Sequence, residues 1–373
     1  MRQKAHGGNL AWAAAIAGCP ADAIVDFSAS ISPLGPPSSV IAAIASQLGN
    51  IQHYPDPDYG ELKLALGRFH QLSPDWILPG NGSAELLTLL GREFAQLTAT
   101  VLLTPAFGDY YRTLAAYNAK VLEFPVSLTG DQGVRSQESG VRSQESEVLP
   151  ITPSPHHPIT PSSDYGLLLN NPHNPTGRLF SRDDILPHLQ DFALVVVDEA
   201  FMDFLPPEQE QSLIELVQEY DNLVILRSLT KFYSLAGLRL GYAIAHPNRL
   251  AKWQSWRDPW PVNTLAEVAA IAALQDTEFQ QLTWKWLPEA RNQLFQGLSS
   301  IDGLRPLEGA VNYLLVESQH STSELQIKLL EQHRILIRDC QSFKELGDRY
   351  FRVAVRTQAD NERLIQAIKL IRE

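Results

Sequence analysis

The chain has 373 residues, and its 30 Lys plus Arg against 42 Asp plus Glu give a formal net charge of -12 at pH 7. This length permits a sizeable buried core, and the acidic balance argues against general binding to nucleic acids or anionic membranes. No apolar run approaches the ~20 residues that span a bilayer. The first eight residues lack the apolar stretch of a secretory signal. Two cysteines, Cys19 and Cys340, are too few for a zinc cluster or a disulfide framework. We therefore expect a cytoplasmic protein without a bound metal.

Residues 1–45 are predicted to form an arm that lies over a folded body. Within them, the segment 26–37 (Asp-Phe-Ser-Ala-Ser-Ile-Ser-Pro-Leu-Gly-Pro-Pro) contains three prolines. Proline lacks the backbone donor that a helix interior needs and fixes an extended or turn conformation. We therefore expect an extended path for this segment.

After the arm, short apolar or β-branched runs alternate with helical patterns. Strands are predicted at 100–103, 167–169, 193–197, 223–226 and 242–245. Such alternation predicts an α/β fold with a mostly parallel sheet covered by helices, assigned to a large domain over 46–283. From residue 284 the pattern changes to amphipathic helices with strands at 312–316 and 350–355. We expect a smaller C-terminal α+β lobe over 284–373.

One stretch interrupts this pattern. The heptad Gly-Val-Arg-Ser-Gln-Glu-Ser at 133–139 is repeated at 140–146, and a tract rich in Pro, Ser and His runs on to residue 163. A polar repeat followed by prolines cannot pack a core, so an inserted surface loop is predicted over about 130–163. The pair His156 and His157 lacks spaced partners for a metal ion.

The first of four polar signals is Lys231, in Ser-Leu-Thr-Lys directly after the strand at 223–226. Open α/β sheets place their ligands at such strand ends. A lysine amine can condense with an aldehyde, while two hydroxyls and a fork-shaped cation suit a phosphate, here from Ser228, Thr230 and Arg239. A lone lysine would be a solvated surface charge, but these neighbours favour a ligand site.

The second signal is Asp198, which ends the apolar strand at 193–197. A carboxylate there can pair with a protonated pyridine nitrogen and keep the ring an electron sink. The alternatives are a magnesium ligand and a helix cap. A magnesium site of the nucleotide-binding type needs a loop ending in Gly-Lys-Ser/Thr, and the sequence contains none.

The third and fourth signals are turns when taken alone. The segment 170–177 (Asn-Asn-Pro-His-Asn-Pro-Thr-Gly) has turn composition, but beside a ring cofactor Asn174 suits a phenolate oxygen. The segment 80–85 (Gly-Asn-Gly-Ser-Ala-Glu) enters a helix, and it fits either a simple cap or an anion held by free N–H groups. With the other signals present, phosphate is favoured.

Together these motifs resemble the class I/II pyridoxal-phosphate (PLP)-dependent aminotransferases, with the aspartate-aminotransferase fold, over nearly the whole chain. The resemblance implies that Lys231 binds PLP and shuttles protons, that Asp198 binds the ring nitrogen and that Asn174 binds the phenolic oxygen. Tyr110, in Pro-Ala-Phe-Gly-Asp-Tyr, would stack on the ring. The implied phosphate contacts are Ser83, Ala84, Ser228, Thr230 and Arg239.

The same resemblance implies contacts beyond the cofactor. Arg352, in Tyr-Phe-Arg-Val-Ala-Val, aligns with an arginine that binds the substrate carboxylate. Tyr54, in Tyr-Pro-Asp-Pro, aligns with a tyrosine that reaches the cofactor phosphate of the neighbouring subunit. A homodimer with shared active sites is therefore implied.

Two branches of this family share shorter segments with the chain. Residues 54–57 and 335–339 resemble histidinol-phosphate aminotransferases. Residues 6–9, 26–35, 260–266 and 338–340 more closely resemble the threonine-phosphate decarboxylases of cobalamin biosynthesis. The closer resemblance implies decarboxylation of L-threonine O-3-phosphate to (R)-1-amino-2-propanol O-2-phosphate. The alternatives are transamination of histidinol phosphate or a similar amine and, more remotely, a non-catalytic PLP-binding protein.

Both candidate substrates carry a phosphate, and the sequence offers cations for it. These are Arg338, Arg352 and Arg356, with His6 closing over from the arm and Asn174 nearby. For Arg338 or Arg356 singly, a surface salt bridge is an equal alternative. Three arginines suffice for a substrate that bears a carboxylate and a phosphate.

Two departures from the family pattern bear on chemistry and substrate contact. Phe201 stands three residues after Asp198, where many aminotransferases have a tyrosine, and a phenyl ring cannot donate to the phenolic oxygen. This departure is compatible with decarboxylation, and it is also compatible with a tolerated substitution. Ser32 stands where the decarboxylase pattern usually has asparagine, which leaves the substrate contact of the arm open.

Overall fold

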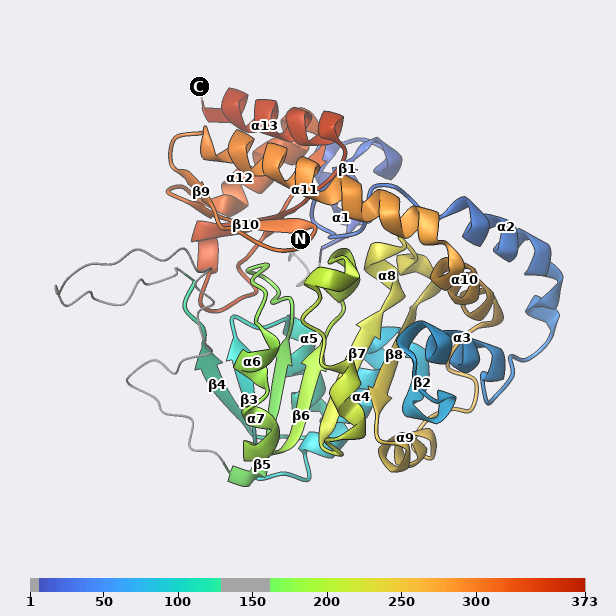
Figure 1. The fold of residues 1–373 in the computed structure, drawn as a ribbon. Coiled ribbons are helices and arrows are strands. Elements are labelled where there is room, and N and C mark those ends of the chain that lie inside the picture. The colour runs from blue at the N-terminus through green and yellow to red at the C-terminus, as the bar shows by residue number, and fades with distance from the viewer. Residues whose placement is uncertain (1–6, 129–161, 373) are drawn as a thin grey trace.

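A computed structural model describes residues 7–128 and 162–372, and its central feature is a seven-stranded sheet (Figure 1). The strand order is β2 (Ile77–Asn81), β8 (Leu240–Ala245), β7 (Leu223–Ser228), β6 (Phe192–Asp198), β5 (Ser162–Asn170), β3 (Ala99–Thr104) and β4 (Val121–Pro125). Strand β8 runs antiparallel to both of its neighbours, and the remaining pairs are parallel. The predicted α/β class with a mostly parallel sheet is confirmed.

Apolar residues on both faces of β6 explain why this strand lies in the centre of the sheet. Val195 and Val197 belong to one hydrophobic cluster, whereas Leu194 and Val196 belong to another. Strands covered on both sides are expected to be apolar throughout. The helices α4 (Gly82–Phe94), α5 (Gly108–Ala116) and α9 (Pro247–Gln254) contribute to the second cluster. Helices α3 (Gly60–His70), α6 (Arg182–Ile185), α7 (His188–Asp191), α8 (Leu229–Phe232) and α10 (Thr264–Gln275) contribute to the first.

The C-terminal elements form a second, antiparallel sheet with its own helices. Its strand order is β12 (Arg338–Asp339), β13 (Tyr350–Ala354), β10 (Tyr313–Ser318) and β9 (Leu304–Pro306). The accompanying helices are α11 (Thr277–Ser299), α12 (Thr322–Lys328) and α13 (Gln358–Arg372), which lie together beyond one end of the large sheet (Figure 1). The predicted boundary between residues 283 and 284 falls inside α11, and the division into domains stays a prediction.

The N-terminal segment contains two helices, one on either side of the stretch 26–37 for which the sequence predicts an extended path. These are α1 (Leu10–Ala17), capped by the Asn9 side chain, and α2 (Ser38–Gln47), which begins directly after Pro37. Between them β1 (Val25–Asp26) pairs in parallel with β11 (Ile335–Leu336). The part from α1 to β1 therefore lies on the C-terminal elements, as Figure 1 shows, whereas α2 packs against α10.

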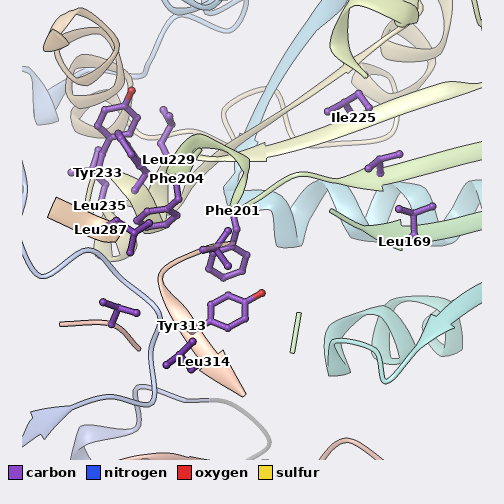
Figure 2. Packing of buried hydrophobic residues seen from close by; sticks show 14 of the residues in the cluster. Leu169, Phe201, Phe204, Ile225, Leu229, Tyr233, Leu235, Leu287, Tyr313 and Leu314 are labelled. Atoms are coloured by element: carbon purple, nitrogen blue, oxygen red, sulfur yellow. The ribbon is translucent and has the colours of Figure 1, made fainter. Parts of the chain in front are cut away.

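Aromatic side chains fill the region between the large sheet and the C-terminal sheet. Figure 2 shows Phe201 facing Tyr313, with their ring centroids 5.0 Å apart, and Phe204 beyond it. Of the helices that the structure describes, none has the length and apolar character needed to cross a membrane. His6 and nearly all of the predicted loop at 130–163 lie outside the described residues.

Candidate active site

A cavity of about 350 Å³ lies at the carboxyl ends of the parallel strands, where the sequence predicts the ligand site. Three parts of the chain line it: the N-terminal segment, the strand ends of the large sheet and the C-terminal sheet. The lining includes Ser83, Tyr110, Asn174, Asp198, Thr230, Lys231, Arg239, Arg338 and Arg352. The structure therefore brings most of the predicted site residues together.

Lys231 lies in the short helix α8, which follows β7. Its Nζ donates a hydrogen bond of 2.6 Å to Oγ1 of Thr230. Burial lowers the pKa of Lys231 to about 8, with Arg239 and Arg352 acting in the same direction and Asp198 opposing them. A lowered amine pKa increases the neutral, nucleophilic fraction near neutral pH.

Asp198 is the last residue of β6 and is 6% exposed. Its Oδ1 accepts from the backbone N–H of Ala200 at 3.0 Å, and its Oδ2 accepts from the Tyr110 hydroxyl at 2.8 Å. Burial raises the pKa of Asp198, whereas these hydrogen bonds and the nearby Lys231 lower it. The carboxylate is thus held in one orientation inside the cavity. The Tyr110 ring was predicted only to stack, and in the structure its hydroxyl also contacts Asp198.

The start of α4 and the segment after β7 form a compact cradle of donors. Gly82 begins α4 with φ +69°, and a Cβ on it would lie 2.7 Å from Nη2 of Arg239. A Cβ on Gly241 would lie 2.7 Å from the backbone N of Ser83. Only glycine permits these approaches, so the backbone N–H groups of α4 and the guanidinium lie close together. Two hydroxyls join them, because Oγ of Ser228 lies 2.7 Å from Oγ1 of Thr230.

This donor set fits the pyridoxal phosphate that the resemblance implies. The cavity offers a buried amine of lowered pKa for an aldehyde, and a buried carboxylate for a ring nitrogen. It also offers helix N–H groups, hydroxyls and a guanidinium for a phosphate. Ala84 and Ser228 do not line the cavity, and Ser228 contacts it only through Thr230.

Two arginines face the cavity from the C-terminal sheet. Arg338 and Arg352 are directly opposite each other on the antiparallel strands β12 and β13. Arg352 donates through Nη1 to Oδ1 of Asn174 and through Nη2 to the backbone oxygen of Ser28 at 3.5 Å. Its Nε has no hydrogen-bond partner among the described residues. Burial lowers the pKa of both guanidiniums, and for Arg338 the nearby Arg352 adds to the effect. Arg338 is buried and Arg352 is half-buried, and these two adjacent cations form an anion-binding wall.

Three of the predicted residues lie away from this cavity. Arg356 does not line it and instead donates to Oδ2 of Asp360 and to the backbone oxygen of Asp26, both at 3.1 Å. Tyr54 is 79% exposed, with its ring centroid 4.5 Å from that of Trp260. Ser32 is buried outside the cavity lining, and its N–H donates to the backbone oxygen of Lys231 at 3.0 Å.

The lining residues that the sequence analysis did not select include Ser30 and Phe343. Ser30 lines the cavity, is 4% exposed, and its Oγ has no hydrogen-bond partner in the part of the chain that the structure describes. Phe343 lines the cavity close after Arg338 in sequence. Ser30 lies inside the proline-containing segment 26–37, so the sequence could have indicated it as a site residue. No motif in the sequence around Phe343 indicates a place in the site.

Phe201 also lines the cavity, and its ring centroid lies 5.8 Å from Nζ of Lys231. The departure noted in the sequence therefore places an apolar ring beside the amine. The ring contributes to the burial around the amine, whereas its face attracts an ammonium, so its two effects on the lysine pKa have opposite signs.

Comparisons with known proteins agree with this geometry. The family model described as "Aminotransferase class I and II" matches residues 22–368. A protein of Salmonella typhimurium named threonine-phosphate decarboxylase is 38% identical over 98% of this chain and 96% of its own length. A histidinol-phosphate aminotransferase of Symbiobacterium thermophilum is 31% identical, covering 93% of this chain and 90% of its own. The crystal structure of L-threonine-O-3-phosphate decarboxylase from Porphyromonas gingivalis superposes with a TM-score of 0.78 at 25% identity, covering 93% of this chain and 99% of the other.

Proposed function

The chain belongs to the aminotransferase class I and II family, and on this premise we propose that it decarboxylates L-threonine O-3-phosphate to (R)-1-amino-2-propanol O-2-phosphate in cobalamin biosynthesis. It is a PLP-dependent enzyme. The observation that carries the substrate class is the adjacent pair Arg338 and Arg352, which faces the same cavity as Lys231. Two cations match a substrate with a carboxylate and a phosphate.

The residues around the cavity take distinct roles in this proposal. Lys231 and Asp198 would hold the cofactor, which when bound supplies an electron sink for the substrate's α-carbon. Asp198 would keep a negative charge at the ring nitrogen. Lys231, with its pKa near 8, is suited to take up and return a proton near neutral pH. Ser83, Thr230 and Arg239 would hold the phosphate of the cofactor.

The arginine pair determines which substrate bond is presented for cleavage. Asn174 and the backbone oxygen of Ser28 fix the Arg352 guanidinium, while Ser342 accepts from Nη2 of Arg338 at 2.7 Å. Two fixed anchors restrict rotation of a substrate that carries an anion at each end. If this orientation sets the carboxylate bond perpendicular to the ring, carbon dioxide is lost. If it sets the hydrogen there, the amino group is transferred.

A single-turnover experiment distinguishes these outcomes. The PLP-loaded protein is mixed with L-threonine O-3-phosphate and no keto acid, and carbon dioxide release and the absorbance of the cofactor are followed together. The proposal predicts carbon dioxide release with the starting spectrum restored. Amino transfer to the cofactor without carbon dioxide would overturn it and favour the histidinol-phosphate aminotransferase alternative, tested next with histidinol phosphate and 2-oxoglutarate.

The proposal includes a homodimer with shared active sites and a cytoplasmic location. The support for the dimer is an exposed apolar surface around Tyr54 and Trp260, which are 79% and 42% exposed. Ile41, Leu48, Ile51, Leu64 and Phe69, in the same part of the sequence as Tyr54, are exposed as well. Exposed apolar side chains that gather on one surface are typical of protein interfaces. Sedimentation velocity tests the dimer, and a Tyr54→Ala variant with unchanged PLP affinity would contradict the shared site.

A further inference from the structure

A buried ion cluster lies behind the cavity, centred on Arg227 of β7. Arg227 is 1% exposed and donates through Nε to Oε2 of Glu199 at 2.9 Å. Its Nη1 donates to Oδ1 of Asp203 at 2.5 Å, and its Nη2 lies 3.5 Å from Oε2 of Glu210. None of these four side chains lines the cavity. One guanidinium thus holds three carboxyl groups outside the lining of the cavity.

The cluster joins the two strand ends that carry the functional groups. Asp198 of β6 pairs in register with Leu226 of β7, and the backbone N–H of Glu199 donates to the Leu226 oxygen at 2.8 Å. Glu199 directly follows Asp198, and Arg227 precedes Lys231 by four residues. The ion pair between Glu199 and Arg227 therefore links β6 and β7 directly after their last paired residues.

Glu199 is held from both sides of its carboxylate. Besides Arg227, its Oε2 accepts from the Ser212 hydroxyl at 2.6 Å, and its Oε1 accepts from the backbone N–H of Leu213 at 3.1 Å. These bonds fix the segment that returns from Glu199 to Leu213, which includes Phe201 on the cavity wall. A fully bonded carboxylate has one orientation, so the backbone next to Asp198 is fixed as well.

Stability alone does not account for such a cluster. Replacing buried ion pairs by apolar residues of similar volume is often neutral or stabilising, because desolvation offsets the attraction between the charges. Directional bonds instead specify geometry, and a site needs its groups held to within a fraction of an ångström. The groups that need this control here are Asp198 and Lys231.

We infer that Glu199 and Arg227 are positioning residues that fix the Asp198 carboxylate relative to the Lys231 amine and thereby set the affinity for pyridoxal phosphate. The inference depends on the cofactor of the family and not on the choice between decarboxylation and transamination. Its failure is therefore distinguishable from failure of the proposed substrate.

The test compares Arg227→Met with a matched control. Arg249→Met removes another ion pair, in which Arg249 Nη1 lies 2.5 Å from Oε1 of Glu93, between α9 and the end of α4 away from the cavity. For each variant we would measure the melting temperature of the apoprotein, the dissociation constant for PLP, and the pH midpoint of the absorbance change of the bound cofactor.

We expect Arg227→Met to weaken PLP binding at least roughly tenfold and to move the pH midpoint, as outer-layer partners of a bound group commonly do. The control should change neither quantity. Arg227→Lys should restore part of the affinity. Glu199→Gln, which keeps the side-chain shape, should show the same two effects and decides the question if Arg227→Met does not fold. The inference would be overturned if the pH midpoint of these variants is unchanged and if their PLP affinity falls only as far as the melting temperature of the apoprotein falls.

Discussion

The hydroxyl of Tyr110 donates a hydrogen bond of 2.8 Å to Oδ2 of Asp198, joining α5 to the end of β6 inside the cavity. This bond lowers the pKa of a carboxyl group that burial would otherwise raise further. The bond therefore favours the charged form of Asp198, the form that pairs with a protonated ring nitrogen.

Tyr110→Phe keeps the aromatic ring and removes only this donor. Hydrogen bonds to charged groups contribute about 1.5 to 3 kcal/mol, so PLP affinity should fall by about tenfold or more. Titration of the apoprotein with PLP measures this. Tyr111→Phe is the control, since Tyr111 adjoins it in sequence but does not line the cavity. Equal affinities for the Tyr110→Phe variant and the unmodified protein would contradict the role given to the bond.

Arg352 and Arg356 should respond differently to the same substitution. Arg352 faces the cavity, so Arg352→Met should raise KM for L-threonine O-3-phosphate by about 100-fold, as expected for a lost charged partner in a buried site. Arg356 contacts Asp360 and Asp26 instead. Arg356→Met should lower the free energy of unfolding by about 1 kcal/mol and change KM little. Steady-state kinetics and urea unfolding separate the two effects, and a comparable rise in KM for both variants would disprove the distinction.

The lowered pKa of Lys231, about 8, predicts how the apoprotein takes up PLP. Only the neutral amine attacks an aldehyde, so the uptake rate should rise about tenfold per pH unit below pH 8 and level off above it. Stopped-flow absorbance over pH 6 to 10 measures the profile. Lys231→Ala should abolish the covalent phase. A rate still rising steeply at pH 10 would show an amine of ordinary pKa.

Gly82→Ala tests the cradle at the start of α4. The φ of +69° is unfavourable for alanine, and the added Cβ would lie 2.7 Å from the Arg239 guanidinium. The backbone cost is about 1 to 2 kcal/mol, and displacing the guanidinium should weaken PLP binding as well. Gly108→Ala is the control, because its Cβ would meet no atom within 4 Å. Isothermal titration with PLP should show a loss for the first variant only.

The sequence indicated five strands of the large sheet but not the two at its edges. Strand β2 contains Pro79 and Gly80, which are turn signals, yet an edge strand tolerates proline because one side of it needs no donor. Strand β4 at the opposite edge is largely exposed, and Glu123 and Pro125 break up its apolar residues. For β2 and β4, pairing with a neighbouring strand determines the strand conformation, and the local sequence pattern does not.

The same limit applies to the site. Asp198 and Lys231 follow apolar strands, and the rule that strand ends gather in parallel sheets was enough to place them together. Arg352 and Arg356 look equivalent in sequence, but β13 ends at Ala354. Arg356 lies beyond that end, and its side chain pairs with Asp360, which follows four residues later in α13. Spacing alone does not reveal that difference.

The parallel pairing of β1 with β11 matches Val25 with Ile335, so residues more than 300 positions apart hydrogen-bond directly. The Phe27 N–H donates to the Leu336 oxygen, and the Ala354 N–H donates to the Phe27 oxygen. During synthesis on the ribosome, the β1 segment must therefore wait for β11, which is made more than 300 residues later, before it can take its place. The large sheet can form earlier, but the wall that carries Ser28, Ser30 and Arg352 is completed only after β13 has been made. A truncated chain lacking the C-terminal strands would lose both sides of that wall at once.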